Sequence, residues 1–267
     1  MGADIKKLRT RIKSVDSTLH LTKAMGLVAS SKIRRATDAM NKGKEYASAF
    51  EETVSRLTAC EETKRTPYMA ERKAEKVCLV VIAGDRGLAG GYNANIFRLL
   101  RDYEGARILP IGKRACERYG EKICYTENYP YENAAALAET VCREFLEGKI
   151  DKLGVVCTKY HSLMSQEAYV RWLLPLTRDE NAEVGDAIFE PDAQTVLDAV
   201  VPAYVAGMIV ACARESFACE VAARRVAMDS AGKNAGEMLD TLGLAYNRAR
   251  QGAITQEITE IVAGSGI

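Results

Sequence analysis

A glycine-rich turn is the first feature of this sequence that could carry chemistry. Residues 84–91 read GDRGLAGG and follow the apolar run Val77–Ala83. Backbone N–H groups in such a turn can bind phosphate where a helix begins after it. The spacing matches neither the dinucleotide-binding fingerprint nor the P-loop, because Lys followed by Ser or Thr is missing. We interpret it as a tight structural turn and keep nucleotide binding as the alternative; its residues are Gly84, Asp85, Arg86, Gly87, Gly90 and Gly91.

The other reactive residues form no catalytic or metal-binding pattern. The sequence has eight cysteines without a CxxC pair, and its two histidines, His20 and His161, are not at ligand spacing from a cysteine. A G-x-S-x-G motif and a Cys–His dyad are also missing. Most of the cysteines fall on apolar faces, where free Cys behaves as a small hydrophobe. We expect reduced thiols, no cofactor, no metal and no catalysis by this chain alone.

The elements that position the turn are indicated by the distribution of proline. All six prolines lie from Pro67 to Pro202, so that residues 1–66 and 203–267 contain none. A helix of roughly 60 residues extends about 90 Å, which is too long to bury its apolar stripe on one compact core. The hydrophobic residues of the C-terminal stretch recur at helical spacing. They are Met238, Leu242, Ala245, Ala249, Ile254, Ile258 and Ile261.

The N-terminal stretch shows the seam pattern of a coiled coil, with apolar or small residues in alternating steps of three and four. We therefore expect two long terminal helices wound together, with a globular domain inserted between them. The predicted parts are residues 1–66, 67–202 and 203–267. The predicted seam positions are Ile5, Leu8, Ile12, Val15, Leu19, Thr22, Gly26, Ala29, Ile33, Ala36, Met40, Gly43, Ala47, Phe50, Val54 and Leu57.

Strands alternate with helices in the central part, which indicates an α/β layer fold with a largely parallel sheet. No unbroken run of eighteen apolar residues occurs, so we expect no membrane span. The basic N-terminus lacks the apolar run of a signal peptide. The predicted strands are Val77–Ala83, Ile108–Ile111, Lys122–Thr126, Leu153–Thr158, Ala168–Leu174 and Ala187–Phe189. Four helices are predicted in the same part: one that starts near Asn93, a short one that ends near Arg118, Ala134–Leu146, and a short one between Pro191 and Pro202.

Charge is balanced over the chain but uneven along it. The net charge is +1, so no global field points to nucleic acid. From Met1 to Lys44, however, eleven Lys or Arg stand against three Asp, a local excess of +8. This stretch is either a solvated flank of the coiled coil or a surface for an acidic partner. A scaffold or nucleic-acid tether is a further alternative, and it predicts salt-sensitive DNA binding.

Three stretches together resemble the gamma subunit of F-type ATP synthases. IKSVDSTLHLTKAMGLVASSKIRRA (12–36) is similar to the N-terminal helix motif of that family, and DRGLAGGYNANI (85–96) is similar to its D-[RK]-G-L-x-G-G-[FY]-N motif. The C-terminal blocks AARRVAMDSAGKNAGEMLDTL (222–242) and YNRARQGAITQEITEIVAG (246–264) closely match its signature. The resemblance covers nearly the whole chain in order. It implies a Rossmann-like α/β domain inserted between two terminal helices that form an antiparallel coiled coil.

The resemblance also implies a function and partners. Gamma subunits are the non-catalytic central rotor shaft of F1Fo ATP synthase, inside a ring of alpha and beta subunits, with a foot that binds the epsilon subunit and the c ring. The resemblance implies no nucleic-acid partner, no cofactor and a peripheral position on the cytoplasmic face of the bacterial inner membrane. The residues that it assigns to beta-subunit contact and torque transmission are Lys23, Met25, Arg224, Arg250, Gln251, Thr255, Gln256 and Glu257.

Overall fold

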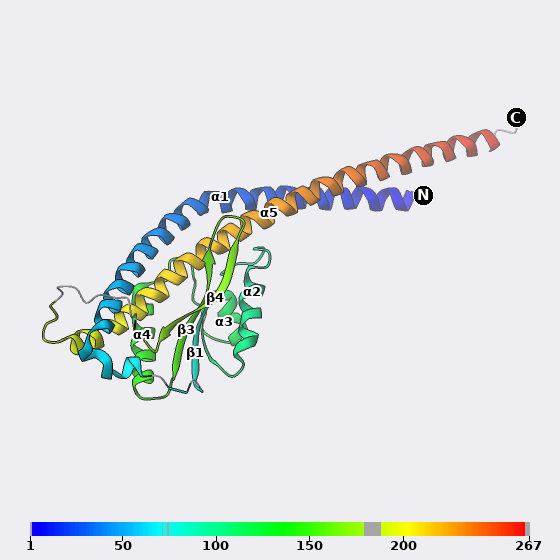
Figure 1. The fold of residues 1–267 in the computed structure, drawn as a ribbon. Coiled ribbons are helices and arrows are strands. Elements are labelled where there is room, and N and C mark those ends of the chain that lie inside the picture. The colour runs from blue at the N-terminus through cyan, green and yellow to red at the C-terminus, as the bar shows by residue number, and fades with distance from the viewer. Residues whose placement is uncertain (1, 71, 74, 179–187, 265–267) are drawn as a thin grey trace. The chain divides into compact units, whose positions relative to one another are not determined.

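The computed structural model describes residues 2–70, 72–73, 75–178 and 188–264 (Figure 1). The chain begins and ends with a long helix, and all other elements lie between these two helices in the sequence. The residues form two compact units. The helical unit contains the described residues up to Ser30 and from Arg224 onward, and the α/β unit is Ser31–Ala223. The elements are α1 (Gly2–Ala59), β1 (Val77–Ile82), α2 (Tyr92–Leu99), β2 (Arg107–Ile111), α3 (Lys113–Tyr119), α4 (Tyr131–Leu146), β3 (Lys152–Tyr160), β4 (Gln166–Leu174) and α5 (Ala193–Gly264), with short 3-10 helices at Glu61–Arg65, Pro67–Met69 and Leu100–Tyr103.

The sheet of the α/β unit has the order β2-β1-β3-β4. β1 pairs in parallel with β2 and β3, whereas β3 and β4 are antiparallel neighbours. The residues of β1 alternate between two hydrophobic clusters, as expected where both faces of a strand are covered. Val80 packs in the cluster that contains Phe145 of α4 and Met208 of α5, and Val81 packs in the cluster that contains Ile96 of α2. The first part of α5 is therefore a core element of this unit.

The predicted coiled-coil seam of α1 is confirmed, because each of its positions from Ile5 to Leu57 is buried or half-buried. In the α/β unit, the small residue Gly43 lets α1 approach α5 closely. A Cβ atom added there would lie 3.3 Å from Cδ of Arg214 and 3.5 Å from Cα of Ala211. Large side chains further along the seam, such as Leu57, lie in the core instead.

Four of the predicted strands are present, and one is wrong. Residues Lys122–Thr126 form no strand. The N–H group of Thr126 donates to the side chain of Asp85 at 2.8 Å, and so it is not available to a sheet ladder. The predicted strand Ala187–Phe189 lies partly outside the described residues, and its described residues, 188 and 189, are not in a strand.

The C-terminal helix begins earlier than predicted. α5 starts at Ala193 and continues through Pro202, without the separate short helix expected between the two prolines. A proline inside a helix costs about 3 kcal/mol. Here the flanking residues Val201 and Val205 are fully buried in the core, and their packing stabilises the helix across the proline. The predicted domain boundaries at 66/67 and 202/203 remain a prediction, with α1 ending at Ala59.

The sequence has no unbroken run of eighteen apolar residues, but one helix has a high mean hydropathy. α5 contains an 18-residue window of mean hydropathy 2.0, and by length and composition alone it could cross a membrane. Within the structure, 67% of that window is buried. The apolar character of this part of α5 is accounted for by its place in the core of the α/β unit, where Leu197, Val205 and Ile209 are fully enclosed.

We predict that Gly112→Ala destabilises the α/β unit strongly. Gly112 precedes α3 with φ +92°, and an added Cβ would lie 2.0 Å from the carbonyl oxygen of Ala83. Left-handed strain and overpacking together should lower the free energy of unfolding by about 3 kcal/mol or more. Gly120→Ala is the matched control: its φ is +70° with nothing within 4 Å, so that only about 1 kcal/mol of strain is expected.

Urea unfolding followed by tryptophan fluorescence measures both variants. The single tryptophan, Trp172, lies in β4 and therefore reports on the α/β unit. Equal unfolding midpoints for the Gly112→Ala and Gly120→Ala variants would contradict the close approach of Gly112 to the end of β1.

Candidate functional site

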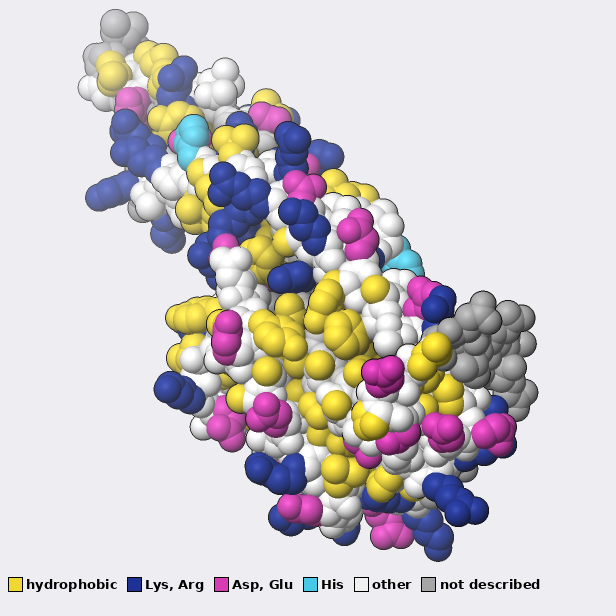
Figure 2. All heavy atoms as spheres, turned by 90° about the vertical axis from the view of Figure 1, so that its left-hand side faces the viewer, with side chains coloured by type: hydrophobic (Ala, Val, Ile, Leu, Met, Phe, Trp, Pro, Cys, Tyr) yellow, Lys and Arg dark blue, Asp and Glu magenta, His cyan; other side chains and the backbone are white. Residues whose placement is uncertain are grey.

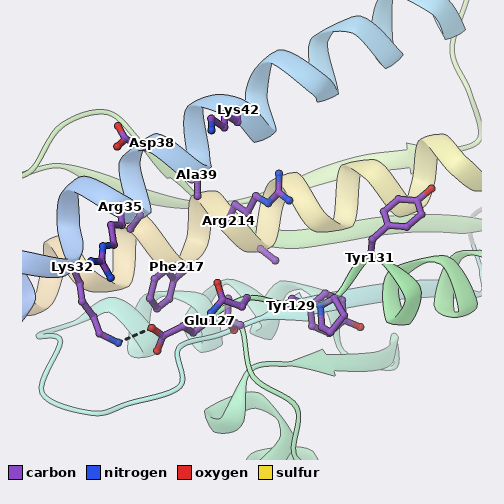
Figure 3. Close-up of a pocket in the computed structure, with 15 residues that line it drawn as sticks. Lys32, Arg35, Asp38, Ala39, Lys42, Glu127, Tyr129, Tyr131, Arg214 and Phe217 are labelled. Carbon is purple, nitrogen blue, oxygen red and sulfur yellow. Dashed lines mark hydrogen bonds and ion pairs between the residues drawn. The ribbon is translucent and has the colours of Figure 1, made fainter.

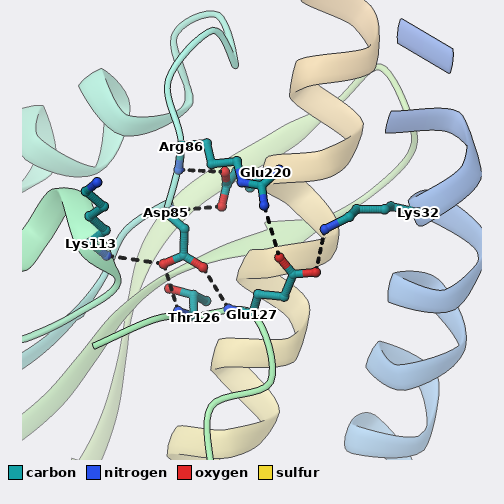
Figure 4. Close-up of polar contacts among 7 residues, drawn as sticks. All are labelled: Lys32, Asp85, Arg86, Lys113, Thr126, Glu127 and Glu220. Carbon is teal, nitrogen blue, oxygen red and sulfur yellow. Dashed lines mark hydrogen bonds and ion pairs between the residues drawn. The ribbon is translucent and has the colours of Figure 1, made fainter. Parts of the chain in front are cut away.

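The glycine-rich turn is bound by a carboxylate from α5. The N–H groups of Asp85 and Arg86 donate to the two carboxylate oxygens of Glu220, at 3.0 and 3.1 Å. Figure 4 shows the Glu220 side chain against the backbone of this turn. Only 1% of the Glu220 surface is exposed. Two of the backbone donors that a phosphate would use are thus already occupied by the chain itself.

Gly84 is required by this close approach. A Cβ atom at this position would lie 2.9 Å from Cδ of Glu220 and 3.1 Å from Oδ1 of Asn93. The N–H group of Gly84 donates to the same Asn93 oxygen at 2.9 Å, which links the turn to the first residues of α2. A glycine permits this packing because it has no side chain. The backbone N–H groups of Gly84, Asp85 and Arg86 are therefore all bound by side chains of this unit.

The side chain of Asp85 links three further segments at the end of β1. Its carboxylate accepts hydrogen bonds from the N–H groups of Lys113 (3.2 Å), Thr126 (2.8 Å) and Glu127 (2.8 Å). Asp85 is only 7% exposed, so these bonds lie largely out of water. They bind the start of α3 and the segment before α4 to the glycine-rich turn. Hydrogen bonds to a charged group contribute about 1.5–3 kcal/mol each.

Residues 215–220 of α5 include three polar residues that make the corresponding bonds from the helix; we name these six residues the anchor segment. Glu215 accepts from the N–H group of Tyr160 at 3.0 Å, and Oγ of Ser216 accepts from the N–H group of Thr158 at 3.2 Å. The phenol of Tyr92 donates to the carbonyl oxygen of Ser216 at 2.9 Å. Together with Glu220, these bonds fix α5 to the ends of β1 and β3 and to α2.

Two neighbours complete the electrostatics of the anchor segment. Nζ of Lys44, on α1, lies 2.8 Å from Oε1 of Glu215, so the buried carboxylate has a cationic partner. Burial raises the pKa of Tyr92 well above its ordinary value, which keeps its phenol a hydrogen-bond donor. Sequence reasoning missed Glu215, Ser216 and Glu220. The available signal was two carboxylates and a serine inside an otherwise apolar stretch of helix.

The helical unit contains a second candidate site, a groove of about 560 Å³ between α1 and α5. Gly26 lies against Met228, whose Cβ is 3.7 Å from the position of an added Cβ, and Gly232 faces Thr22 at 3.6 Å. These pairs show that the two helices are antiparallel. The guanidinium of Arg225 closes one end of the groove by donating to the Gly26 carbonyl oxygen at 3.3 Å and to the Ser30 hydroxyl.

Cations surround this groove, and glycines shape it. Lys23 and Lys233 line it together with Arg225, while Asp229 is the only carboxylate among its lining residues. Figure 2 shows many Lys and Arg side chains over the helical unit. Because Gly26, Gly232 and Gly236 have no side chains, the groove is open to a partner's side chains.

The predicted contact residues fall into two groups. Lys23 is exposed and lines the groove, and Met25 is half-buried. Arg224 differs from the other predicted contacts, since it is only 8% exposed. The second group is exposed on the last part of α5: Arg250, Gln251, Thr255, Gln256 and Glu257.

The register of the helical unit explains the exposure of the second group. Residue 26 lies opposite 228 and residue 22 opposite 232. Each step back along α1 matches one step forward along α5, which sets residue 2 opposite residue 252. The later part of α5 extends past the first residue of α1, and the predicted stripe residues Ile254, Ile258 and Ile261 are 47%, 57% and 71% exposed. The described part of α1 therefore does not cover these three side chains.

The fold and these sites define a protein class: an α/β domain inserted between two paired terminal helices, with no catalytic constellation among the described residues. Residues 4–266 match the family described as ATP synthase. The ATP synthase gamma chain of Moorella thermoacetica is 38% identical over 98% of both chains. The sodium ion specific ATP synthase gamma chain of Acetobacterium woodii is 34% identical over 99% of both. The chain belongs to the ATP synthase gamma chain family, and so it is one subunit of an enzyme complex.

Solved structures show the same fold at low sequence identity. A chain of the Euglena gracilis mitochondrial ATP synthase (OSCP/F1/c-ring, rotational state 3) matches with a TM-score of 0.72 at 17% identity, over 98% of this chain and 94% of that one. A chain of the Tetrahymena thermophila mitochondrial ATP synthase central stalk and c-ring matches with a TM-score of 0.61 at 22% identity, over 79% of this chain and 99% of that one.

We predict that Glu220→Gln weakens the attachment of α5 to the sheet. The amide replaces one acceptor oxygen by a donor, so that one of the two turn N–H groups loses its partner in a buried site. The expected loss in the free energy of unfolding is about 2–3 kcal/mol. Hydrogen exchange at the amides of Asp85 and Arg86 should become faster. Glu139→Gln on the exposed face of α4 is the matched control. Unchanged amide exchange in the Glu220 variant would contradict the assignment.

Proposed function

We propose that this chain is the central rotor shaft of an F1Fo ATP synthase and couples ion-driven rotation of the c ring to ATP synthesis or hydrolysis at the alpha and beta subunits. The observation that carries the proposal is the continuity of α5, which runs unbroken from Ala193 in the core of the α/β unit to Gly264 in the helical unit. A turning force applied to the α/β unit passes along one helix without crossing a loop.

The anchor segment supports the transmission of torque by α5. A helix can transmit torque only if it does not rotate within the domain that holds it. Glu215, Ser216 and Glu220 bind backbone groups of the sheet and of the glycine-rich turn, and all three side chains are buried. Breaking a buried bond to a charged group leaves an unpaired group out of water, which costs several kcal/mol. The helix therefore resists rotation about its own axis within the α/β unit.

The groove of the helical unit is the proposed contact with an acidic loop of the beta subunit. Lys23 and Lys233 are exposed on its rim, with Arg225 beside them. Exposed ion pairs contribute about 0–1 kcal/mol each, so such a contact can form and separate at every step of rotation. Met25 lies two residues from Lys23, and Arg224 is next to Arg225; both are proposed to support the same surface.

The last part of α5 is the proposed bearing. Arg250, Gln251, Thr255, Gln256 and Glu257 offer polar contacts to the beta subunits. The exposed residues Ile254, Ile258 and Ile261 suit an apolar sleeve formed by the alpha and beta subunits around the end of the helix. Exposed apolar side chains at helical spacing, with no partner on α1, are expected where another subunit surrounds a helix.

The remaining partners follow from the same assignment. The α/β unit is the proposed foot, bound by the epsilon subunit and the c ring, which places the chain at the membrane as a peripheral component on the cytoplasmic face of a bacterial inner membrane. The chain itself is proposed to be non-catalytic, with the chemistry in the alpha and beta subunits. This is consistent with the glycine-rich turn, whose donors bind Glu220 instead of a phosphate.

Purification of the tagged full-length chain from the membranes of its host tests the function directly. We expect two larger subunits in equal amounts and ATP hydrolysis in the purified material. Recovery of the chain alone, or hydrolysis of ATP by the chain without those subunits, would show that the rotor assignment is wrong.

A charge-reversal experiment tests the groove. In an assembled complex of alpha, beta and this chain, Lys23→Glu combined with Lys233→Glu should slow ATP hydrolysis about fivefold, the effect of roughly 1 kcal/mol on a rate. Arg98→Glu combined with Arg101→Glu is the control, because these two exposed arginines of the α/β unit give the same change of charge and do not line the groove. An equal effect of both changes would argue against the groove as the contact, while leaving the co-purification result unaffected.

A further inference from the structure

The α/β unit contains a cavity that shares only Phe217 with the anchor segment and no residue with the groove. Its volume is about 760 Å³, within the range of small-molecule sites. Three segments line it: α1, α5 and residues 126–131, which run from the loop after α3 to the first residue of α4 (Figure 3). Enclosure by three segments of one unit suits a compact ligand better than a helix or strand of another protein, which needs a long open groove.

The charges in this cavity favour an anion. Four cationic side chains line it, against the two carboxylates of Asp38 and Glu127. Glu127 is already paired, with Nζ of Lys32 at 2.6 Å from its Oε1. The other three cations, Arg35, Lys42 and Arg214, form no ion pair with a described residue and are exposed to solvent. A multiply charged anion could bind them at little desolvation cost, and two of them are arginines, which bind phosphate in a bidentate geometry.

Three aromatic rings lie beside these cations. Tyr129 and Tyr131 come from the loop and the start of α4, and Phe217 comes from α5. Aromatic faces stack on planar bases and contribute about 1–3 kcal/mol per base in nucleic-acid sites. Burial raises the pKa of Tyr129 to about 12, so its phenol stays neutral and adds no negative charge near the cations.

We propose that this cavity binds a nucleoside polyphosphate, with its base against Tyr131 at one end of the cavity and its phosphates at Arg35, Lys42 and Arg214. The size of the cavity, its unpaired cations and its rings each match one part of such a ligand. The site is separate from the glycine-rich turn, whose donors bind Glu220. It would make the foot of this chain responsive to the concentration of a soluble nucleotide.

Isothermal titration calorimetry of the full-length chain with ATP at low salt tests the proposal. Arg35→Ala and Arg214→Ala should each raise the Kd of ATP about tenfold, the ratio for one charge-assisted hydrogen bond. Both side chains are exposed, so the variants should fold, and circular dichroism checks this. Arg101→Ala removes an exposed arginine of the same unit outside the cavity and should leave the Kd unchanged. Inorganic triphosphate should bind at least tenfold more weakly than ATP, because it lacks a base.

Three results would overturn the proposal. The first is no ATP binding by the wild-type chain at millimolar concentration, and the second is equal weakening by Arg101→Ala, which marks a diffuse charge effect. The third is equal affinity for triphosphate and ATP, which marks an anion site without recognition of a base. If ATP does not bind and the Arg35→Ala, Arg214→Ala double variant fails to recover its partner subunits from membranes, the cavity instead receives an acidic protein segment. The three binding results do not depend on whether the wild-type chain assembles as a rotor; only the recovery of partner subunits does.

Discussion

The structure depends on one buried carboxylate. Glu220 lies on a helix, yet its oxygens bind the backbone of a turn at the end of β1, at 3.0 and 3.1 Å. A carboxylate so fully removed from water is stable only with several donors. The turn supplies two of them because Gly84 has no side chain to keep the helix away. The same turn places Asp85 where its carboxylate binds the start of α3 and the loop before α4. A helix, a strand end and two loops are thereby held by two acidic side chains.

The two ends of α5 meet opposite requirements. Its first part is enclosed by the sheet, α4 and α1, and even tolerates Pro202, because packing around Val201 and Val205 outweighs the lost hydrogen bond. Its last part lies past the first residue of α1 and exposes isoleucines at helical spacing. One helix therefore combines a core element of the α/β unit with a surface that the described part of α1 does not cover.

Much of this architecture could be predicted from the sequence, because it rests on local patterns. The three-and-four spacing of α1 predicted each seam position, and the apolar runs predicted β1, β2, β3 and β4. What failed depends on partners distant in the chain. Lys122–Thr126 has the composition of a strand, but it forms none, and the N–H group of its last residue, Thr126, donates to Asp85. The anchor segment was missed because the periodicity of a helix does not reveal which of its polar residues will meet a turn more than a hundred residues away.

The strong contacts within the α/β unit and the weak ones expected at the exposed lysines are those that the proposed rotor needs. A shaft has to hold its own foot permanently and release its surroundings at every step. The first requirement calls for buried bonds to charged groups, such as those of Glu215 and Glu220, which contribute more as water is excluded. The second calls for exposed charges in high dielectric, such as Lys23 and Lys233, whose pairs are weak and screened by salt. If the contacts within the α/β unit were exposed and those with the ring were buried, α5 would rotate within its own unit and the ring would hold the shaft at one angle. The distribution of burial along α1 and α5 is therefore itself an argument for the proposed rotation.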